Sequence, residues 1–164
     1  MIKKMILTAA VAMVAVPAMA SAQSTVTATA TVAQYSQLSG TGDLAFGTLS
    51  RTVDNTINAA GGVGSATRGL SYNHNVNVTF TSVPTNLTSL AGNNLGVALT
   101  CASRIGAGAW SASAACSTAS MDLDVGAALT AATLGFGGTI TAVNAAAAVA
   151  GDYSGTFNIV VVAR

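Results

Sequence analysis

The feature that most constrains this chain is an alternation of residue types with a period of two, which a β-strand satisfies and an α-helix does not. The C-terminal stretch from Tyr153 to Ala163 shows it at the greatest length. One face carries Tyr153, Gly155, Phe157, Ile159, Val161 and Ala163, and the other carries Ser154, Thr156, Asn158, Val160 and Val162. We therefore expect the chain to end in a strand with one apolar face.

Several shorter stretches show the same alternation, and glycine or asparagine residues bound them. The expected strands are 43–49, 71–80, 95–101, 120–125 and 138–143. The alanine-rich segment 142–150 has helical propensity, but it is short and apolar on all sides, so we expect an extended connection or a weak strand there. Strand spacings of this kind favour an all-β sandwich over any α/β fold.

The first residues have the composition of a secretory signal peptide. Lys3 and Lys4 precede an apolar run over 5–16, and small residues at 18–22 offer cleavage sites, the best of them after Ala22. We expect residues 1–22 to be removed during export. The remainder has the length of one ordinary domain.

Charge is scarce after residue 22. Four arginines stand against five aspartates, so the side chains carry a net charge of −1, and no lysine or glutamate remains. Nucleic-acid binding depends on clustered Lys and Arg, so the sequence argues against that partner. With 51% hydrophobic and 7% charged residues the chain is too apolar for disorder. A surface so poor in charge suits a subunit that works within an assembly.

The chain has two cysteines, Cys101 and Cys116. An exported protein meets an oxidising compartment, so we expect a disulfide between them. Closing a loop of about 15 residues is worth roughly 3 kcal/mol in the chain-entropy model. The loop contains Trp110, which either covers the disulfide, the interpretation we favour, or offers a stacking platform for a sugar.

Residues suited to catalysis are few. His74 is the only histidine and lies between two asparagines, and no G-x-S-x-G motif is present. Asp122 and Asp124 share one face of an expected strand, which indicates a solvated face rather than a cation site. The glycine runs 61–64 and 135–138 lack the lysine of a phosphate loop and predict turns or bulges. We expect no enzymatic activity, no cofactor and no metal.

The stretch from Ser24 to Val32 alternates threonine with small apolar residues. Val26, Ala28, Ala30 and Val32 would share one face of a strand, and Thr25, Thr27, Thr29 and Thr31 the other. The alternation fits a first strand of the chain's own domain and a strand that enters a neighbouring molecule equally well. Residues 35–42 provide a flexible connection that allows either arrangement.

Four stretches together resemble a known group of exported bacterial proteins. They are the threonine-rich N-terminus, Leu-Ala-Phe-Gly at 44–47, the segment 134–141, and the ending at 151–161, which is similar to a G-x-Y-x-G-T-x-x-V-x-V terminal strand. The layout resembles the spore coat protein U type and, more distantly, the chaperone–usher pilins. The cysteines are central in this chain and its end is Val162-Ala163-Arg164, which departs from the pilin pattern.

The resemblance implies an immunoglobulin-like antiparallel sandwich over 35–164 that lacks one strand, which the 23–34 extension of a neighbouring subunit supplies. The donor residues would be Val26, Ala28, Ala30 and Val32, and the acceptor groove would contain Phe46, Tyr153, Phe157, Ile159 and Val161. The implied protein is a secreted homopolymeric filament, pilus or coat subunit at the cell surface. It would pass through the periplasm, with a periplasmic chaperone and an outer-membrane usher as partners. The alternative is a monomeric secreted adhesin or carbohydrate-binding module.

Overall fold

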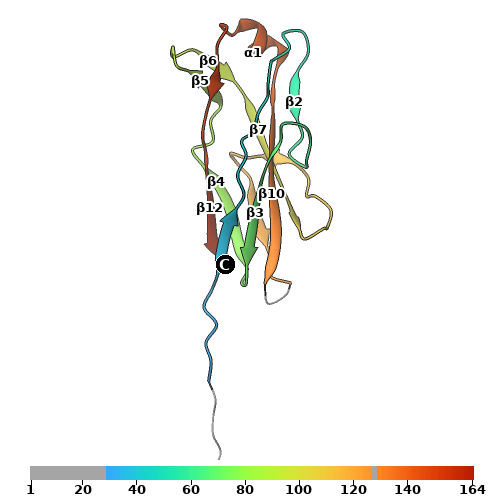
Figure 1. The fold of residues 1–164 in the computed structure, drawn as a ribbon, viewed down its shortest axis with the longest axis vertical. Coiled ribbons are helices and arrows are strands. Elements are labelled where there is room, and N and C mark those ends of the chain that lie inside the picture. The colour runs from blue at the N-terminus through green and yellow to red at the C-terminus, as the bar shows by residue number, and fades with distance from the viewer. Residues whose placement is uncertain (1–28, 127–128) are drawn as a thin grey trace, which may run out of the picture. The chain divides into compact units, whose positions relative to one another are not determined.

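The computed structural model describes residues 29–126 and 129–164 (Figure 1). The chain divides into two parts, Met1–Val32 and Ala33–Arg164. In the first part, the described residues 29–32 are exposed and lack regular secondary structure. The second part contains all the strands and the helix reported below.

Strands make up 45% of the described residues and helix 4%, so the protein is all-β. The strands are β1 (Ser36–Ser39), β2 (Asn55–Ile57), β3 (Ala66–Tyr72), β4 (Val76–Thr81), β5 (Asn86–Ser89), β6 (Asn94–Gly96), β7 (Ala98–Ile105), β8 (Ala114–Ala115), β9 (Ser120–Leu123), β10 (Thr130–Ile140), β11 (Tyr153–Ser154) and β12 (Asn158–Ala163). The helix is α1 (Ala142–Ala147).

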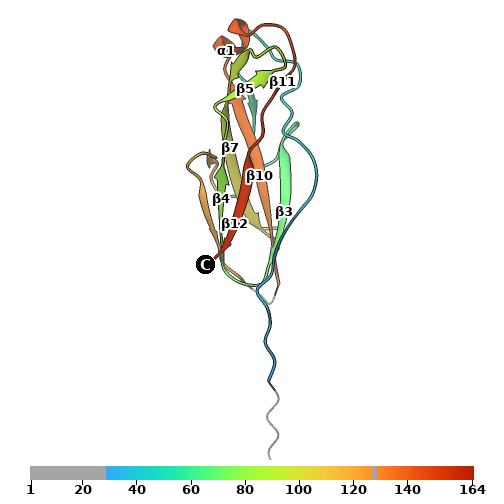
Figure 2. The ribbon, with the colours of Figure 1, turned by 90° about the vertical axis from the view of Figure 1, so that its left-hand side faces the viewer.

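Three antiparallel sheets form two layers. The larger sheet has the order β1-β3-β10-β7-β8, and β2 pairs with β10 beyond the end of β3. The smaller sheets have the orders β12-β4-β9 and β11-β5-β6. Figures 1 and 2 show β12 and β4 facing β3 and β10 across the core. The arrangement is β-sandwich-like, as the alternation predicts.

The core lies between the layers because both carry the expected alternation. On β4, Val76, Val78 and Phe80 are buried, and on β10 Leu134 and Phe136 are buried opposite them. The rings of Phe80 and Phe136 meet edge to face, with centroids 5.8 Å apart. Such a pair adds about 0.5–1.5 kcal/mol beyond the burial of its area.

The prediction of one strand over 71–80 is wrong. Tyr72 ends β3 in one layer and Val76 begins β4 in the other, and the chain turns between them. Both residues are fully buried, so the period of two continues across the turn and conceals it. The two asparagines of the turn form hydrogen bonds with neighbouring segments. Asn73 Nδ2 donates to the Ala33 carbonyl at 2.9 Å, and Asn75 Oδ1 accepts from Val125 N at 2.9 Å.

Other boundaries also differ from expectation. Segment 43–49 forms no strand; its main chain bonds the turn before β3, from Ala45 N to the Gly64 carbonyl at 3.0 Å, without forming a ladder. The expected strand 95–101 divides at Val97 into β6 and β7, and the C-terminal strand divides into β11 and β12. The strand expected over 138–143 begins earlier, at Thr130, and ends at Ile140.

The expectation of an extended connection over 142–150 is also wrong, because α1 occupies Ala142–Ala147. Thr141 caps the helix by accepting from Asn144 N at 3.2 Å, and Asp54 accepts from Ala142 N at 2.8 Å. Ala145 is the buried residue of the helix. Two caps and one apolar contact therefore allow the alanines to adopt their intrinsic preference.

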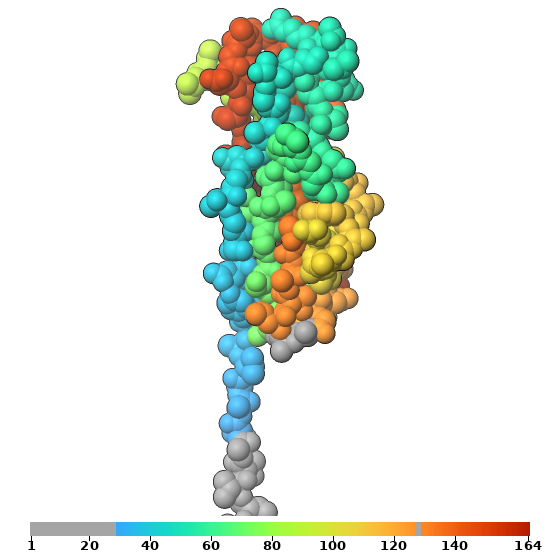
Figure 3. Space-filling model, turned by 45° about the vertical axis from the view of Figure 1, so that its right-hand side comes forward, coloured from blue at the N-terminus to red at the C-terminus, as the bar shows by residue number. Residues whose placement is uncertain are grey.

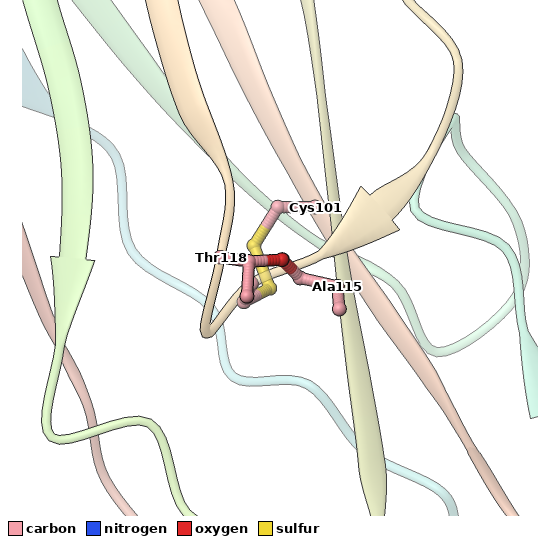
Figure 4. Close-up of a disulfide and its surroundings, with 4 residues drawn as sticks. Cys101, Ala115 and Thr118 are labelled. Atoms are coloured by element: carbon pink, nitrogen blue, oxygen red, sulfur yellow. A yellow bond between two sulfur atoms is a disulfide. The ribbon is translucent and has the colours of Figure 1, made fainter.

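The expected disulfide between Cys101 and Cys116 is confirmed, with both residues fully buried (Figure 4). Cys101 pairs with Phe136 on the core face, and the next pair, Ala102 with Gly135, lies on the opposite face of the sheet. The Trp110 ring packs against Gly135, within the loop that Figure 3 shows in yellow. Trp110 therefore lies on the opposite face from the disulfide, and the expectation that it covers the bond is wrong.

The glycine run 135–138 lies inside β10, whereas a turn or bulge was expected. A Cβ at Gly135 would overlap the Ala59 carbonyl, and one at Gly137 would overlap the Ile57 carbonyl. These glycines let the chain that follows β2 cross closely over β10.

We predict that Gly137→Ala lowers the free energy of unfolding by about 1–3 kcal/mol, since the added methyl meets main chain that cannot move aside easily. Gly62→Ala is the control, because its Cβ would have ordinary contacts at 3.9 Å. Urea unfolding of the two variants measures the difference, and equal midpoints would contradict the crossing.

Tyr72 provides a pH-dependent test of the core. Its side chain is fully buried and its hydroxyl donates to the Asp124 carbonyl at 3.3 Å. Desolvation, and secondly the Asp124 charge, raise the pKa of Tyr72 above its ordinary value. The folded state thus holds this proton to higher pH than the unfolded state, so the stability it contributes is complete below about pH 10 and declines as pH rises further.

We expect the free energy of unfolding of the wild type to fall between about pH 9 and about pH 11 more than that of Tyr72→Phe. Tyr35→Phe, at an exposed tyrosine, is the control and should keep the wild-type fall. Denaturant unfolding at the two pH values measures the effect. An identical fall in Tyr72→Phe would show that Tyr72 is not its source.

Candidate functional site

A groove of about 1140 Å³ runs along one side of the sandwich. One wall is the connection 42–49 between β1 and β2, and the other is the chain from Ala148 to Ile159, which includes β11. The apolar floor consists of Ala66, Leu87, Leu95, Leu99, Phe136, Ile140 and Ala145. The floor belongs to the hydrophobic core: Leu87 is half-buried and the other floor residues are buried, so the groove runs directly over the core.

The second wall continues into an edge strand. Within the described part of the chain, β12 pairs with β4 alone, from Asn158 opposite Thr81 to Ala163 opposite Val76. An edge strand presents a row of unpaired N–H and C=O groups on its free side. The first two residues of β12, Asn158 and Ile159, line the groove.

Phe157 forms the aromatic part of this wall. Its ring lies 5.4 Å from that of Phe136 and 6.3 Å from that of Phe80, both edge to face. Phe136 and Phe80 are buried, whereas Phe157 is half-buried. The same aromatic cluster therefore belongs to the core on one side and to the groove on the other.

The wall formed by 42–49 is held at its ends. Arg68 Nη1 donates to the Gly42 carbonyl at 2.7 Å, and Arg51 Nη2 donates to the Ala148 carbonyl at 3.3 Å. The second bond joins the two walls at one end of the groove. Both guanidinium groups are thus engaged with main-chain oxygens, and the interior is left to apolar side chains and main chain.

Four of the five residues expected in an acceptor groove line this one: Phe46, Tyr153, Phe157 and Ile159. The fifth, Val161, does not line it, but packs half-buried against the core opposite Val78. The structure therefore brings these residues together along one face. Their role as acceptors of a strand stays a prediction.

The expected donor residues are described only in part. Val26 and Ala28 lie outside the described residues. Ala30 and Val32 are exposed, Val32 to 84%, and belong to no strand. The division of the chain after Val32 falls inside the expected extension 23–34.

Other candidate residues have structural partners. His74 Nδ1 lies 3.1 Å from Asn73 Oδ1 in the turn between β3 and β4. Arg164 forms ion pairs with Asp122, at 2.9 Å, and with Asp124. Residues 29–126 and 129–164 contain no cluster of His, Cys, Asp or Glu that could hold a metal. In the same ranges, no helix has the length and hydropathy to cross a membrane.

Trp110 was the candidate for sugar stacking. The Arg104 guanidinium carbon lies 4.8 Å from the centre of its ring, and the ring also contacts Gly135. Arg104 Nε is buried and has no hydrogen-bond partner. Because the ring already packs against Arg104 and β10, its face is not an open platform.

Sequence reasoning missed two features around the groove: the Arg51 bond that joins its walls, and α1, whose Ala145 reaches the floor. Neither is visible in the alternation, since arginine at the end of a loop and alanine in a short run are both common in unrelated settings. The Thr141 cap before the alanine run was the available signal for the helix.

No protein-family model matches the sequence, and comparisons with curated proteins and with solved structures find no significant match. The function is therefore inferred from the groove itself.

The free side of β12 can be tested by amide hydrogen exchange. In an antiparallel edge strand, alternate residues direct their N–H groups to the neighbouring strand and the others direct them away. We expect alternating slow and fast exchange along 158–163, and uniformly slow exchange along β4, which has neighbours on both sides. Equally slow exchange at all positions of β12 would mean that its free side is covered.

Proposed function

We propose that the protein is a structural subunit of an extracellular bacterial filament or surface coat, whose copies join when the strand Ser24–Val32 of one enters the groove of the next. The open apolar groove beside edge strand β12 carries this proposal. The signal peptide predicted at 1–22 supports export, and the low charge supports an assembled state.

The chemistry of groove and strand is complementary. The groove offers an apolar floor and, along β12, a row of main-chain groups without a neighbouring strand. The strand offers Val26, Ala28, Ala30 and Val32 on one face, with threonines on the other. The rings of Phe46 and Phe157 line the groove, and small side chains would fit beside them. The inserted strand would cover the apolar floor and extend the sheet of β12.

The finer fold belongs to the same proposal. With the strand inserted, the layer β12-β4-β9 would gain a member beside β12, and the layers would close as in an immunoglobulin-like sandwich. A periplasmic chaperone and an outer-membrane usher are proposed partners for delivery, because a subunit with an open apolar groove risks aggregation before assembly.

We predict that Ala28→Asp in the full chain abolishes assembly while export continues, because the carboxylate would lose its hydration in an apolar groove. Thr27→Asp is the matched control: it adds the same charge one residue away, on the outward face, and should still assemble. Cell-surface material is compared on denaturing gels with and without boiling and by negative-stain electron microscopy.

The wild type and Thr27→Asp should give a ladder that collapses to one band on boiling, together with thin filaments. Ala28→Asp should give a single band and no filaments. Normal filaments from Ala28→Asp would refute the donor assignment. A single band and no filaments from the wild type would instead refute the proposed function.

A further inference from the structure

Arg104 lies on the outer face of β7 and has no oxygen atom as a partner. Cys101 and Ser103 are on the core face of this strand, so Arg104 points the other way, where its guanidinium carbon lies 4.8 Å from the centre of the Trp110 ring. Its Nε is the one buried side-chain nitrogen or oxygen in residues 29–126 and 129–164 without a hydrogen-bond partner. Buried polar groups of this kind are rare and require an explanation.

The other three arginines after residue 22 each interact with oxygen atoms. Arg51 donates to the Ala148 carbonyl, Arg68 donates to the Gly42 carbonyl, and Arg164 pairs with two aspartates. The two Nη groups of Arg104 make no hydrogen bond within the described chain. The end of this guanidinium is therefore available to an oxygen ligand from outside the molecule.

The five aspartates can be sorted in the same way. Three of them have partners, and these are Asp54, Asp122 and Asp124. Asp43 and Asp152 are exposed and form no hydrogen bond or ion pair within the described chain, and both line the groove. No lysine or glutamate follows residue 22. The charged side chains without an oppositely charged or hydrogen-bonding partner are therefore one arginine and two aspartates.

These charges cannot meet within one molecule. In the larger sheet β10 and β3 lie between β7 and β1, and the groove wall with Asp43 follows β1. Neighbouring strands are about 4.8 Å apart, so β7 and β1 are about 14 Å apart, which is farther than an arginine side chain extends. Asp152 belongs to the other wall of the groove. A partner for Arg104 must come from a second molecule.

The free end of Arg104 fits a carboxylate. A guanidinium can donate two parallel hydrogen bonds to the two oxygens of a carboxylate. The Trp110 ring already restricts the Arg104 side chain, so little conformational freedom is lost when the pair forms.

Of the two aspartates, Asp152 is the better partner. Arg68 bonds the carbonyl of Gly42, directly before Asp43, so a guanidinium already lies near that carboxylate. In the wall that contains Asp152, the arginine contact is at Ala148, farther along the chain. Asp152 therefore has the less compensated charge.

We infer that Arg104 of one subunit pairs with Asp152 of a second copy of this chain, and that this contact joins filaments side by side. The inference rests on the proposed function and adds the lateral contact that a coat requires. The two residues lie on different faces, so the contact is heterologous and repeats from copy to copy. One exposed pair is weak, but a filament offers one per subunit, and many weak contacts act together.

The test exchanges charges in the full mature chain at low ionic strength, where surface charges are screened least. Arg104→Asp and Asp152→Arg each bring like charges together and should weaken each contact by up to about fivefold. The double variant restores an opposite pair with the two residues exchanged. Asp43→Arg is the matched control, because it makes the same change of charge at the other groove aspartate. Unboiled denaturing gels report strand exchange, and low-speed sedimentation with electron microscopy reports side-by-side association.

We expect the wild type and all four variants to give the ladder of bands. The wild type, the double variant and Asp43→Arg should sediment as bundles, and the two other single variants should stay in the supernatant as separate filaments. Salt at about 1 M, where the Debye length is about 3 Å, should separate the wild-type bundles.

The outcomes separate the inference from the proposed function. If the wild type forms no ladder, the proposed function fails and the lateral contact fails with it. If the ladder forms but wild-type filaments do not associate, or Arg104→Asp filaments associate as the wild type does, the inference alone is wrong. Bundles in Asp152→Arg, no bundles in the double variant, or loss of bundles in Asp43→Arg would each overturn the pairing with Asp152.

The fluorescence of Trp110, the single tryptophan of the chain, checks that the variants at Arg104 keep the local structure. Arg104→Lys serves where Arg104→Asp does not fold. Lysine keeps the charge and an aliphatic stem but cannot donate two parallel hydrogen bonds. Its filaments should form weaker bundles than those of the wild type, and bundles of equal salt resistance would contradict the paired geometry.

Discussion

The packing of β4 against β10 positions the rest of the sandwich. Each is a central strand of its layer: β4 pairs with β12 and β9, and β10 pairs with β3, β7 and β2. The contact between Phe80 and Phe136 joins the two layers where Phe157 also packs. Away from this contact, the Arg51 bond to the Ala148 carbonyl joins the two walls of the groove. The layers pack closely at β4 and β10, and the groove lies at the side of the sandwich where no strand of the described chain fills the space between its two walls.

The alternation in the sequence predicted much of this because burial in a sandwich has a period of two. It predicted the all-β class, and the expectation of export predicted the disulfide. The alternation failed at the turn between β3 and β4. Tyr72 and Val76 are both core residues, so the burial pattern continues although the chain reverses between them. It also failed at Gly137, a strand residue at which the main chain of residues 57–59 approaches too closely for a side chain. Such long-range approaches leave no local pattern. The groove residues could be proposed from the terminal strand, but the lack of an oxygen partner at Arg104 is visible only in the contacts.

The asparagines at 73, 75 and 77 illustrate how one polar face serves several segments. Asn73 bonds 33–35, Asn75 bonds Val125 through its side chain and Arg164 through its carbonyl, and Asn77 bonds Ser120 and Asp122. Neutral amides can donate and accept at once, so they join these segments without adding charge. Hydrogen bonds from neutral side chains therefore hold these segments together at this end of the domain.

Under the proposed function, the direction of strand insertion would decide what kind of assembly the groove can build. Ser36 at the start of β1 lies opposite Tyr72, and Ala163 at the end of β12 lies opposite Val76, so the N-terminal segment joins the domain at the end where β12 finishes. A donor strand parallel to β12 would bring two such ends together, and each copy could then serve the other in a closed dimer. An antiparallel donor would place its own domain at the opposite end, near α1, leaving its own groove open to a third copy. Heterologous contacts of this kind propagate without closing, so a filament requires the antiparallel direction.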